Sequence, residues 1–94
     1  MKGYEVTYII DPGVSEENVP KVVDKYSEYV TKNEGQVVNI DNWGKRKLAY
    51  EIKGRTEGVY ITMKFNSSAK ATHELKRIMG IDEEIVRNVV LRIN

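Results

Sequence analysis

The chain has 94 residues, of which 40% are hydrophobic and 31% charged, and it carries a net charge of +1 and no cysteine. This length predicts one domain, residues 1–94, and the missing cysteine excludes disulfides, thiolate zinc sites and cysteine nucleophiles. A near-neutral charge argues against a protein held to nucleic acid by bulk positive charge alone. No run approaches the roughly 20 apolar residues of a membrane helix, and we expect a cytoplasmic protein.

Residues 3–10 predict a strand with one buried face. Side chains alternate between the two faces with a period of two residues, and the even positions form the predicted buried set: Tyr4, Val6, Tyr8 and Ile10. The turn residues 11–13, Asp-Pro-Gly, end the strand.

A helix with one apolar stripe follows this strand. The residues that recur at helical spacing are Val19, Val22, Val23, Tyr26 and Val30. Ser15 as N-cap would place Pro20 one residue beyond the positions that tolerate a missing N–H, whereas Asn18 would place it in the first turn. The sequence leaves both caps open, and Gly35 is the predicted C-terminal stop.

Residues 35–53 predict a long strand that is interrupted near its middle. Val38 and Ile40 begin the alternation, residues 41–44 disturb it, and Gly44 predicts a bulge or bend. The alternation then resumes like that of a half-buried strand, with Leu48, Tyr50 and Ile52. Residues 54–58 are the predicted connecting loop.

The second half repeats the order of strand, helix and strand. Residues 59–65 alternate as a third strand, with the odd positions on its apolar side. Ser67 or Ser68 caps a second helix that Gly80 ends, and residues 85–93 predict a fourth strand.

The order βαββαβ predicts an α+β domain of the ferredoxin-like architecture. Each helix has one apolar stripe, so both can cover one face of a four-stranded antiparallel sheet. Right-handed crossovers favour a sheet with the first and third strands at its centre. The other face has no helix to cover it, and its predicted residues are Glu5, Thr7, Ile9, Tyr60, Thr62 and Lys64.

The sequence predicts no catalytic residue, metal site or cofactor. The single histidine, His73, reads as a solvated helix residue, and the acidic residues 82–84 read as solvated turn residues. Phosphate-binding glycine loops and nucleophile motifs are missing. An RNA-recognition motif also fits poorly, because the aromatic residues of the first strand face the core.

Basic residues suggest two different roles. Lys45, Arg46 and Lys47 are consecutive, so in a strand they project to both faces. Such residues protect an exposed strand edge from aggregation, or contact phosphate with Lys2, Arg87 and Arg92 as contributors. The sequence alone leaves this choice open.

The single tryptophan also has two readings. Trp43, beside the predicted bulge, is either partly buried packing or an anchor at an interface. Tyr60, on the uncovered face, is the aromatic residue most available for stacking.

The segment 44–53, GKRKLAYEIK, resembles the hallmark of the bacterial ribosomal small-subunit protein six family. That hallmark is a glycine, basic and polar positions, Leu-Ala-Tyr, any residue, and isoleucine. The preceding Asp-Asn-Trp step, the start Tyr-Glu-Val at residues 4–6 and the ending at residues 85–92 are similar to the family as well. The resemblance covers nearly all of the chain.

This resemblance implies a ferredoxin-like, non-catalytic ribosomal protein of the cytoplasm. Family members pair with ribosomal small-subunit protein eighteen and bind the small-subunit ribosomal RNA in the central, or platform, region. A basic partner would explain the near-neutral charge of this chain. We expect rRNA contacts from Lys2, Lys45, Arg46, Lys47, Arg87 and Arg92. We expect contacts with the protein partner from Trp43, Leu48, Tyr50 and Tyr60.

Two departures from the family are visible. Glu51 stands where relatives often have proline, which predicts more regular strand pairing there. The sequence given also stops at Asn94, whereas many relatives continue into a polar or acidic tail, so a tail-mediated contact is either absent or belongs to a tail that has been removed.

Two alternatives come from other classes of protein. Ferredoxin-like sheets often dimerise around small molecules, so a small-molecule-binding regulatory module is the second hypothesis. An acylphosphatase is disfavoured, because residues 11–14 supply no arginine for an anion-binding loop.

Overall fold

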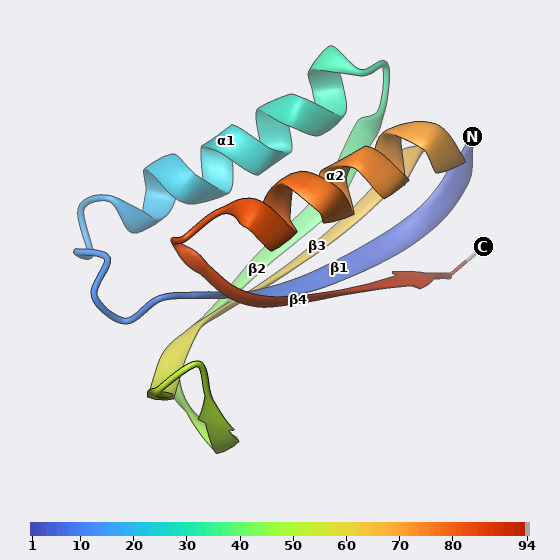
Figure 1. Ribbon diagram of the computed structural model, residues 1–94. Helices are drawn as coiled ribbons and strands as arrows, with labels where there is room; N and C mark the ends of the chain where they lie inside the picture. Colours follow the sequence, from blue (N-terminus) through green and yellow to red (C-terminus); the bar gives the residue numbers. More distant parts are fainter. Residues whose placement is uncertain (94) are drawn as a thin grey trace.

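The computed structural model describes residues 1–93 and confirms the predicted ferredoxin-like βαββαβ order. Both helices lie on one face of a single sheet, and the start of β1 and the end of β4 lie at the same end of it (Figure 1). Neither helix of the described residues is long and apolar enough to cross a membrane. The elements are β1 (Lys2–Ile10), α1 (Val19–Lys32), β2 (Gln36–Ile52), β3 (Arg55–Ser67), α2 (Ala69–Ile81) and β4 (Ile85–Arg92).

The sheet has the strand order β2-β3-β1-β4, with every pair antiparallel. The first and third strands are therefore central, as the crossover rule predicts. Val6 of β1 stands opposite Met63 of β3 on one side and Val90 of β4 on the other. Cross-strand partners share a face, so this register defines a helix-covered face and an open face.

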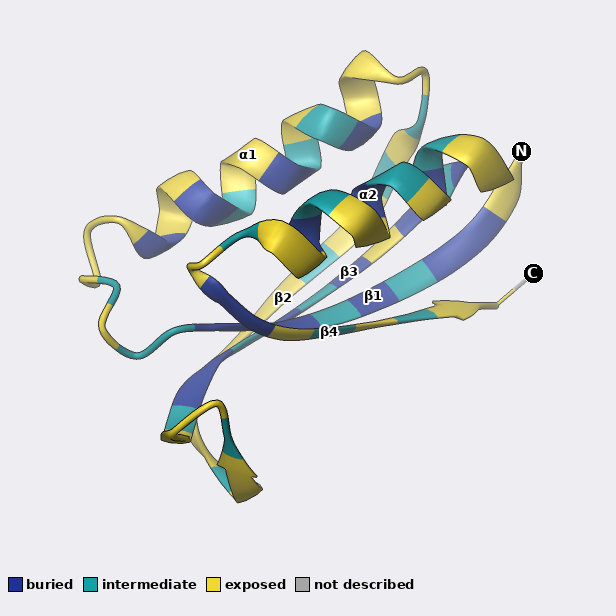
Figure 2. Ribbon diagram, in the orientation of Figure 1, coloured by how far each residue is buried: buried dark blue, intermediate teal, exposed yellow. Residues whose placement is uncertain are grey.

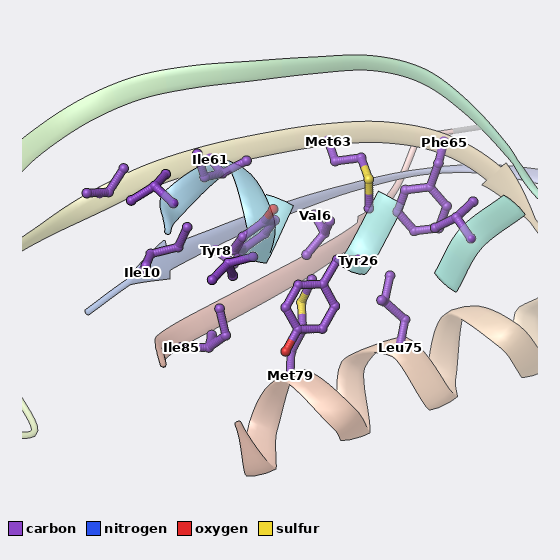
Figure 3. Close-up of a cluster of buried hydrophobic side chains, with 14 of the residues drawn as sticks. Val6, Tyr8, Ile10, Tyr26, Ile61, Met63, Phe65, Leu75, Met79 and Ile85 are labelled. Atoms are coloured by element: carbon purple, nitrogen blue, oxygen red, sulfur yellow. The ribbon is translucent and has the colours of Figure 1, made fainter. Parts of the chain in front are cut away.

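The core lies between the helices and the sheet (Figure 3). As predicted, the even positions from residue 4 to 10 of β1 and the odd positions from residue 59 to 65 of β3 are buried. Figure 2 shows the buried residues of both helices along the side that faces the sheet. The rings of Tyr8 and Tyr26 meet edge to face at 5.7 Å, and Tyr4 stacks on Phe65. Each such buried side chain contributes roughly 1.5–3 kcal/mol.

The caps left open by the sequence are Asn18 for α1 and Ser68 for α2. Asn18 places Pro20 within the first turn, where its missing N–H costs no bond. The hydroxyl of Ser68 accepts a hydrogen bond from the Ala71 amide at 3.1 Å. Gly80, however, does not end α2, which continues to Ile81.

Gly35 has a different role from the predicted helix stop. α1 ends at Lys32, and the residue with the left-handed backbone is Glu34, at φ 64°. A Cβ on Gly35 would lie 2.7 Å from Cγ1 of Val30 and 2.8 Å from the Asn66 carbonyl oxygen. Glycine is therefore required here because the chain enters β2 in contact with its neighbours.

Asp82 is not the solvated turn residue that the sequence suggests. Its carboxylate accepts hydrogen bonds from Lys25, at 2.8 Å, and from the Tyr26 hydroxyl, and it also accepts the Glu84 amide. Burial raises the pKa of Asp82, but these three hydrogen bonds outweigh it and lower the pKa below its usual value. The turn between α2 and β4 is thereby fastened to α1.

The variant Asp82→Asn should lower the free energy of unfolding by about 1.5–3 kcal/mol, because hydrogen bonds to a charged group are removed. A carboxyl with a lowered pKa stabilises the fold above its unfolded pKa of about 3.9 and loses this effect as the pH falls through its folded pKa. The difference between the two proteins in denaturant unfolding should therefore shrink below about pH 4. Glu83→Gln, at an exposed neighbour, should change stability by less than about 0.5 kcal/mol; equal effects would contradict this role.

The connection between β2 and β3 is a tight turn and not the predicted loop of residues 54–58. Lys53 and Gly54 both have positive φ, at 50° and 79°, as a two-residue hairpin turn requires. Residues 46–58, here called the hairpin ribbon, pair only with each other, since β1 pairs with β3 from Val59 onward. Figure 1 shows this ribbon hanging from the open face of the sheet.

Bulges in β2 also correct the predicted alternation near its start. Val37 stands opposite Phe65 and Asn39 opposite Lys64, so Val38 is an extra residue between two paired ones. Val37 packs against the core, whereas Val38 is 61% exposed. The predicted bulge at Gly44 is confirmed by a register shift after Asn42 and a φ of 78°.

Ile9 is buried, at 6% exposure, although it lies on the face that no helix covers. The hairpin ribbon covers it. A Cβ on Gly58 would lie only 2.3 Å from Cγ2 of Ile9 and 3.2 Å from the Ile10 carbonyl oxygen. Glycine at position 58 thus allows the ribbon to lie against Ile9.

Gly58→Ala should lower the free energy of unfolding by about 1–3 kcal/mol, because the added methyl group overpacks the contact with Ile9. Gly80→Ala is the matched control, since a Cβ there meets nothing within 4 Å and the position is helical. This control should raise stability by up to about 1 kcal/mol. Denaturant unfolding of both variants measures the difference, and a stable Gly58→Ala protein would show that the contact is not tight.

Candidate nucleic-acid and protein interface

The hallmark segment forms an irregular bulge within the hairpin ribbon. Lys47 stands opposite Glu57 and Ile52 opposite Arg55, so the four residues 48–51 face Thr56 alone. The regular pairing expected from Glu51 is therefore wrong. A bulge bends the strand that carries it, and here it turns the ribbon toward the open face of the sheet.

A mainly apolar groove lies between the hairpin ribbon and the open face. Leu48, Tyr50 and Ile52 were expected to alternate like a half-buried strand, but Tyr50 is 62% exposed. Leu48 and Ile52 are half-buried against the open face instead of the core. The residues that line the groove include Ile9, Leu48, Tyr50, Ile52, Tyr60 and Val89.

A hydrogen bond joins the hairpin ribbon to the opposite edge of the sheet. Arg87 Nη1 of β4 donates to the Tyr50 hydroxyl at 2.6 Å. β2 and β4 are the two edge strands, so this contact exists only because the ribbon crosses beneath the central strands. Arg87 stands opposite Ile9, which confirms that it lies on the open face.

Trp43 lies on the open face, where it is hydrogen-bonded but more than half exposed. Its indole Nε1 donates to the Thr62 hydroxyl at 3.0 Å, which holds the ring on the open face, yet 54% of the residue remains exposed. The Trp43 carbonyl oxygen accepts a hydrogen bond from Arg46 Nε at 3.0 Å. A half-exposed aromatic ring that is held in place has the properties of an interface anchor.

The basic triplet projects to both faces, as predicted. Lys45 stands opposite Val59 and lies near the start of α1, on the helix-covered side. Arg46 stands opposite Gly58, on the open side, and Lys47 opposite Glu57 alternates back. All three residues are exposed. The edge strand therefore presents cations in two directions.

The other two basic candidates lie apart from this group. Lys2 stands opposite Ser67, and Arg92 stands opposite Tyr4, at the far end of β1. Eight residues of strand separate Lys2 from Ile10, or about 26 Å at 3.3 Å per residue. The structure therefore brings Arg46 and Arg87 to one face at one end, and it places Lys2 and Arg92 at the other end.

Some residues of this surface escaped prediction from the sequence. Val89 and Ile9 line the groove. The prediction of a large apolar residue, Ile9, on a face without helices was the signal that another segment of the chain covers this face. Arg55 also went unnoticed: its Nε donates to Asp11 at 2.8 Å. Burial raises the pKa of Asp11, but the Gly13 amide and the Arg55 guanidinium lower it overall. This ion pair fastens the turn end of the hairpin ribbon to the end of β1.

These features define a class of protein. The domain is ferredoxin-like. Its uncovered sheet face carries an apolar groove, the hydrogen-bonded aromatic rings of Trp43 and Tyr50, and the arginines Arg46 and Arg87. An open sheet face with such groups is typical of a domain that binds other macromolecules.

The chain belongs to the ribosomal protein S6 family, whose family model matches residues 3–92. Small ribosomal subunit protein bS6 of Desulfitobacterium hafniense is 52% identical over 93% of this chain and 92% of that protein. The bS6 protein of Desulforamulus reducens is 44% identical, over 98% and 97% of the two chains.

A solved structure supports the same assignment. The 30S ribosomal protein S6 of Thermotoga maritima superposes with a TM-score of 0.92 at 30% identity, over 98% of this chain and 87% of that one. The C-terminal domain of the MgtC protein of Mycobacterium tuberculosis reaches a TM-score of 0.69 at 10% identity, over 99% and 88% of the two chains, which shows a shared fold alone.

Membership of this family makes the chain a structural protein of the small ribosomal subunit, and so a component of a cytoplasmic particle. The expected family and fold are thus both confirmed. The family also favours the ribosomal hypothesis over the small-molecule-binding module and the acylphosphatase.

Thr62→Val should release the indole ring of Trp43, because the hydroxyl that accepts its N–H is removed. Trp43 is the single tryptophan, so its fluorescence reports this change directly. We expect emission at longer wavelength and stronger acrylamide quenching, with stability lowered by about 1 kcal/mol or less. Thr56→Val, in the exposed part of the hairpin ribbon, is the control. Unchanged quenching in Thr62→Val would show that the hydrogen bond does not hold the ring.

Proposed function

We propose that this protein binds small-subunit ribosomal RNA in the central, or platform, region together with ribosomal small-subunit protein eighteen, and that its role is structural and not catalytic. Family membership supports the ribosomal setting. The observation that carries the binding proposal is the hairpin ribbon, which stands outside the sheet and joins a cationic edge to an apolar groove.

The cationic edge is suited to phosphate. Lys45, Arg46 and Lys47 are exposed on consecutive residues of an edge strand. They point in two directions, so a strand of RNA passing around the edge can meet all three. Arg87 adds a cation on the open face, beside the ribbon. The net charge of +1 requires that such contacts be local.

The groove is suited to a protein partner. Tyr50 and Trp43 leave more than half of their surface exposed, and Val89 adds exposed apolar surface on β4. Contiguous apolar surface of this kind marks protein contact sites, where Tyr and Trp are the commonest anchors. We assign Trp43, Leu48, Tyr50 and Tyr60 to this contact.

Lys2 and Arg92 would meet the RNA at a second place. They lie at the far end of the sheet: on strand geometry, Lys2 is about 26 Å from Ile10, and Arg92, opposite Tyr4, is about 20 Å from it. An RNA that contacts both ends must therefore run along the length of the domain. Their effects on binding should be independent of those of the basic triplet, since distant sites act additively.

Binding of the platform rRNA fragment should tighten when the partner protein is present. Replacing Lys45, Arg46 and Lys47 together by alanine should weaken binding by about tenfold or more, because one charge-assisted hydrogen bond is worth roughly 1.5–3 kcal/mol. The slope of log K against log salt should fall by about 0.7–0.9 for each phosphate that the variant no longer neutralises. Fluorescence anisotropy over a salt series measures both quantities.

A matched control replaces three exposed lysines of the helices, Lys21, Lys70 and Lys76, by alanine. This variant has the same net charge as the triplet variant and should retain the affinity and the salt slope of the parent. If the two triple variants weaken binding equally, net charge matters and the hairpin ribbon does not. If the triplet variant binds normally, these residues only protect the strand edge. An affinity that neither partner nor salt changes would overturn the proposed function.

A further inference from the structure

The surface assigned to RNA and the surface assigned to the protein partner are joined by one side-chain hydrogen bond. Arg87 belongs to the first group and Tyr50 to the second, and Arg87 Nη1 donates to the Tyr50 hydroxyl at 2.6 Å. Two sites that share a side-chain contact do not respond independently. This contact is therefore the place where the two binding events can influence each other.

The geometry leaves both residues able to bind while the contact persists. A planar guanidinium has five N–H donors, and Tyr50 accepts one of the two at Nη1. Arg87 is exposed, and no carboxylate within residues 1–93 forms an ion pair with it. The remaining donors are thus available to a phosphate. The ring of Tyr50 meanwhile lines the groove, where a partner would contact it.

The position of Tyr50 is itself set by the fold. The hydroxyl reaches β4 because the bulge at residues 48–51 bends the hairpin ribbon and because Gly58 lets the ribbon lie against Ile9. Within the ribbon the strands pair only with each other, so this hydrogen bond is one of few constraints on its free end. A partner that packs on Tyr50 would hold the ribbon in this position.

We infer that Tyr50 is a positioning residue that couples partner binding to RNA binding: a protein partner seated in the groove immobilises Tyr50, and its hydroxyl then holds the Arg87 guanidinium in place for a phosphate of the RNA. This inference rests on the proposed function. An arginine that is held before the RNA arrives loses less side-chain freedom on binding, which is a source of positive cooperativity without any large structural change.

The test measures RNA affinity for the full chain with and without ribosomal small-subunit protein eighteen, using the platform rRNA fragment. The ratio of the two affinities is the coupling factor. Tyr50→Phe keeps the ring that contacts the partner and removes the hydroxyl. Its affinity for the partner alone is measured separately. We expect its coupling factor to fall by about fivefold or more, and the slope of log K against log salt, with the partner present, to fall by about 0.7–0.9, the contribution of one phosphate.

Two further variants separate positioning from a structural effect. Tyr29→Phe removes a tyrosine hydroxyl from α1, outside the groove, and should leave the coupling factor unchanged. Arg87→Lys keeps the charge but loses the planar guanidinium with its several N–H donors, so it should lower the coupling factor as Tyr50→Phe does. The double variant Tyr50→Phe/Arg87→Lys should lose little more coupling than either single variant. Thermal unfolding of each variant confirms that the fold is retained.

The outcomes separate this inference from the proposed function. If the unaltered protein shows no partner dependence, the proposed function fails and the inference falls with it. If the unaltered protein shows coupling and Tyr50→Phe retains it in full, the inference alone is overturned. A loss of RNA affinity in Tyr50→Phe that is equal with and without the partner also overturns it, because the hydroxyl would then act without coupling.

Discussion

The contact between Gly58 and Ile9 determines the shape of the surface that this protein presents. No side chain fits at position 58, since a Cβ would lie 2.3 Å from Ile9. The backbone of the hairpin ribbon can therefore lie directly on an isoleucine of the central strand. The groove, the position of Tyr50 and its hydrogen bond to Arg87 all follow from that close approach, because each needs the ribbon beneath the sheet.

Two separate ion pairs stabilise the position of the hairpin ribbon and of the turn between α2 and β4. The ion pair between Arg55 and Asp11 ties the turn end of the hairpin ribbon to the end of β1, and the Asp82 cluster ties the turn between α2 and β4 to α1. Both carboxyl groups have lowered pKa values, since their hydrogen-bond donors outweigh partial burial. The ribbon itself adds no residue to the helix-covered core. The core thus supplies stability, and the ribbon provides the surface that we propose for binding.

This division explains why a near-neutral protein can belong to a ribonucleoprotein particle. Fifteen basic and fourteen acidic residues nearly cancel over the whole chain. The edge strand β2, however, presents three consecutive exposed cations, Lys45, Arg46 and Lys47. Local charge decides which part of the protein meets phosphate, whereas net charge decides only the average attraction at a distance. The edge strand is also protected against pairing with another chain by the same residues.

The sequence by itself determined the element order, the central strands and the helix-covered core. Alternation along residues 4–10 and 59–65 reports directly on burial, because each strand has one face under the helices. It also identified the family and the basic triplet, which are local properties of residues 44–53.

The tertiary structure alone decided the faces and contacts of the hairpin ribbon. Val38 is exposed because a bulge adds one residue to β2, and Ile9 is buried because a distant ribbon lies over it. Tyr50 meets Arg87 across the whole sheet for the same reason. Periodicity describes how side chains alternate within one strand, but it contains no information on how far a strand bends or what it finally packs against.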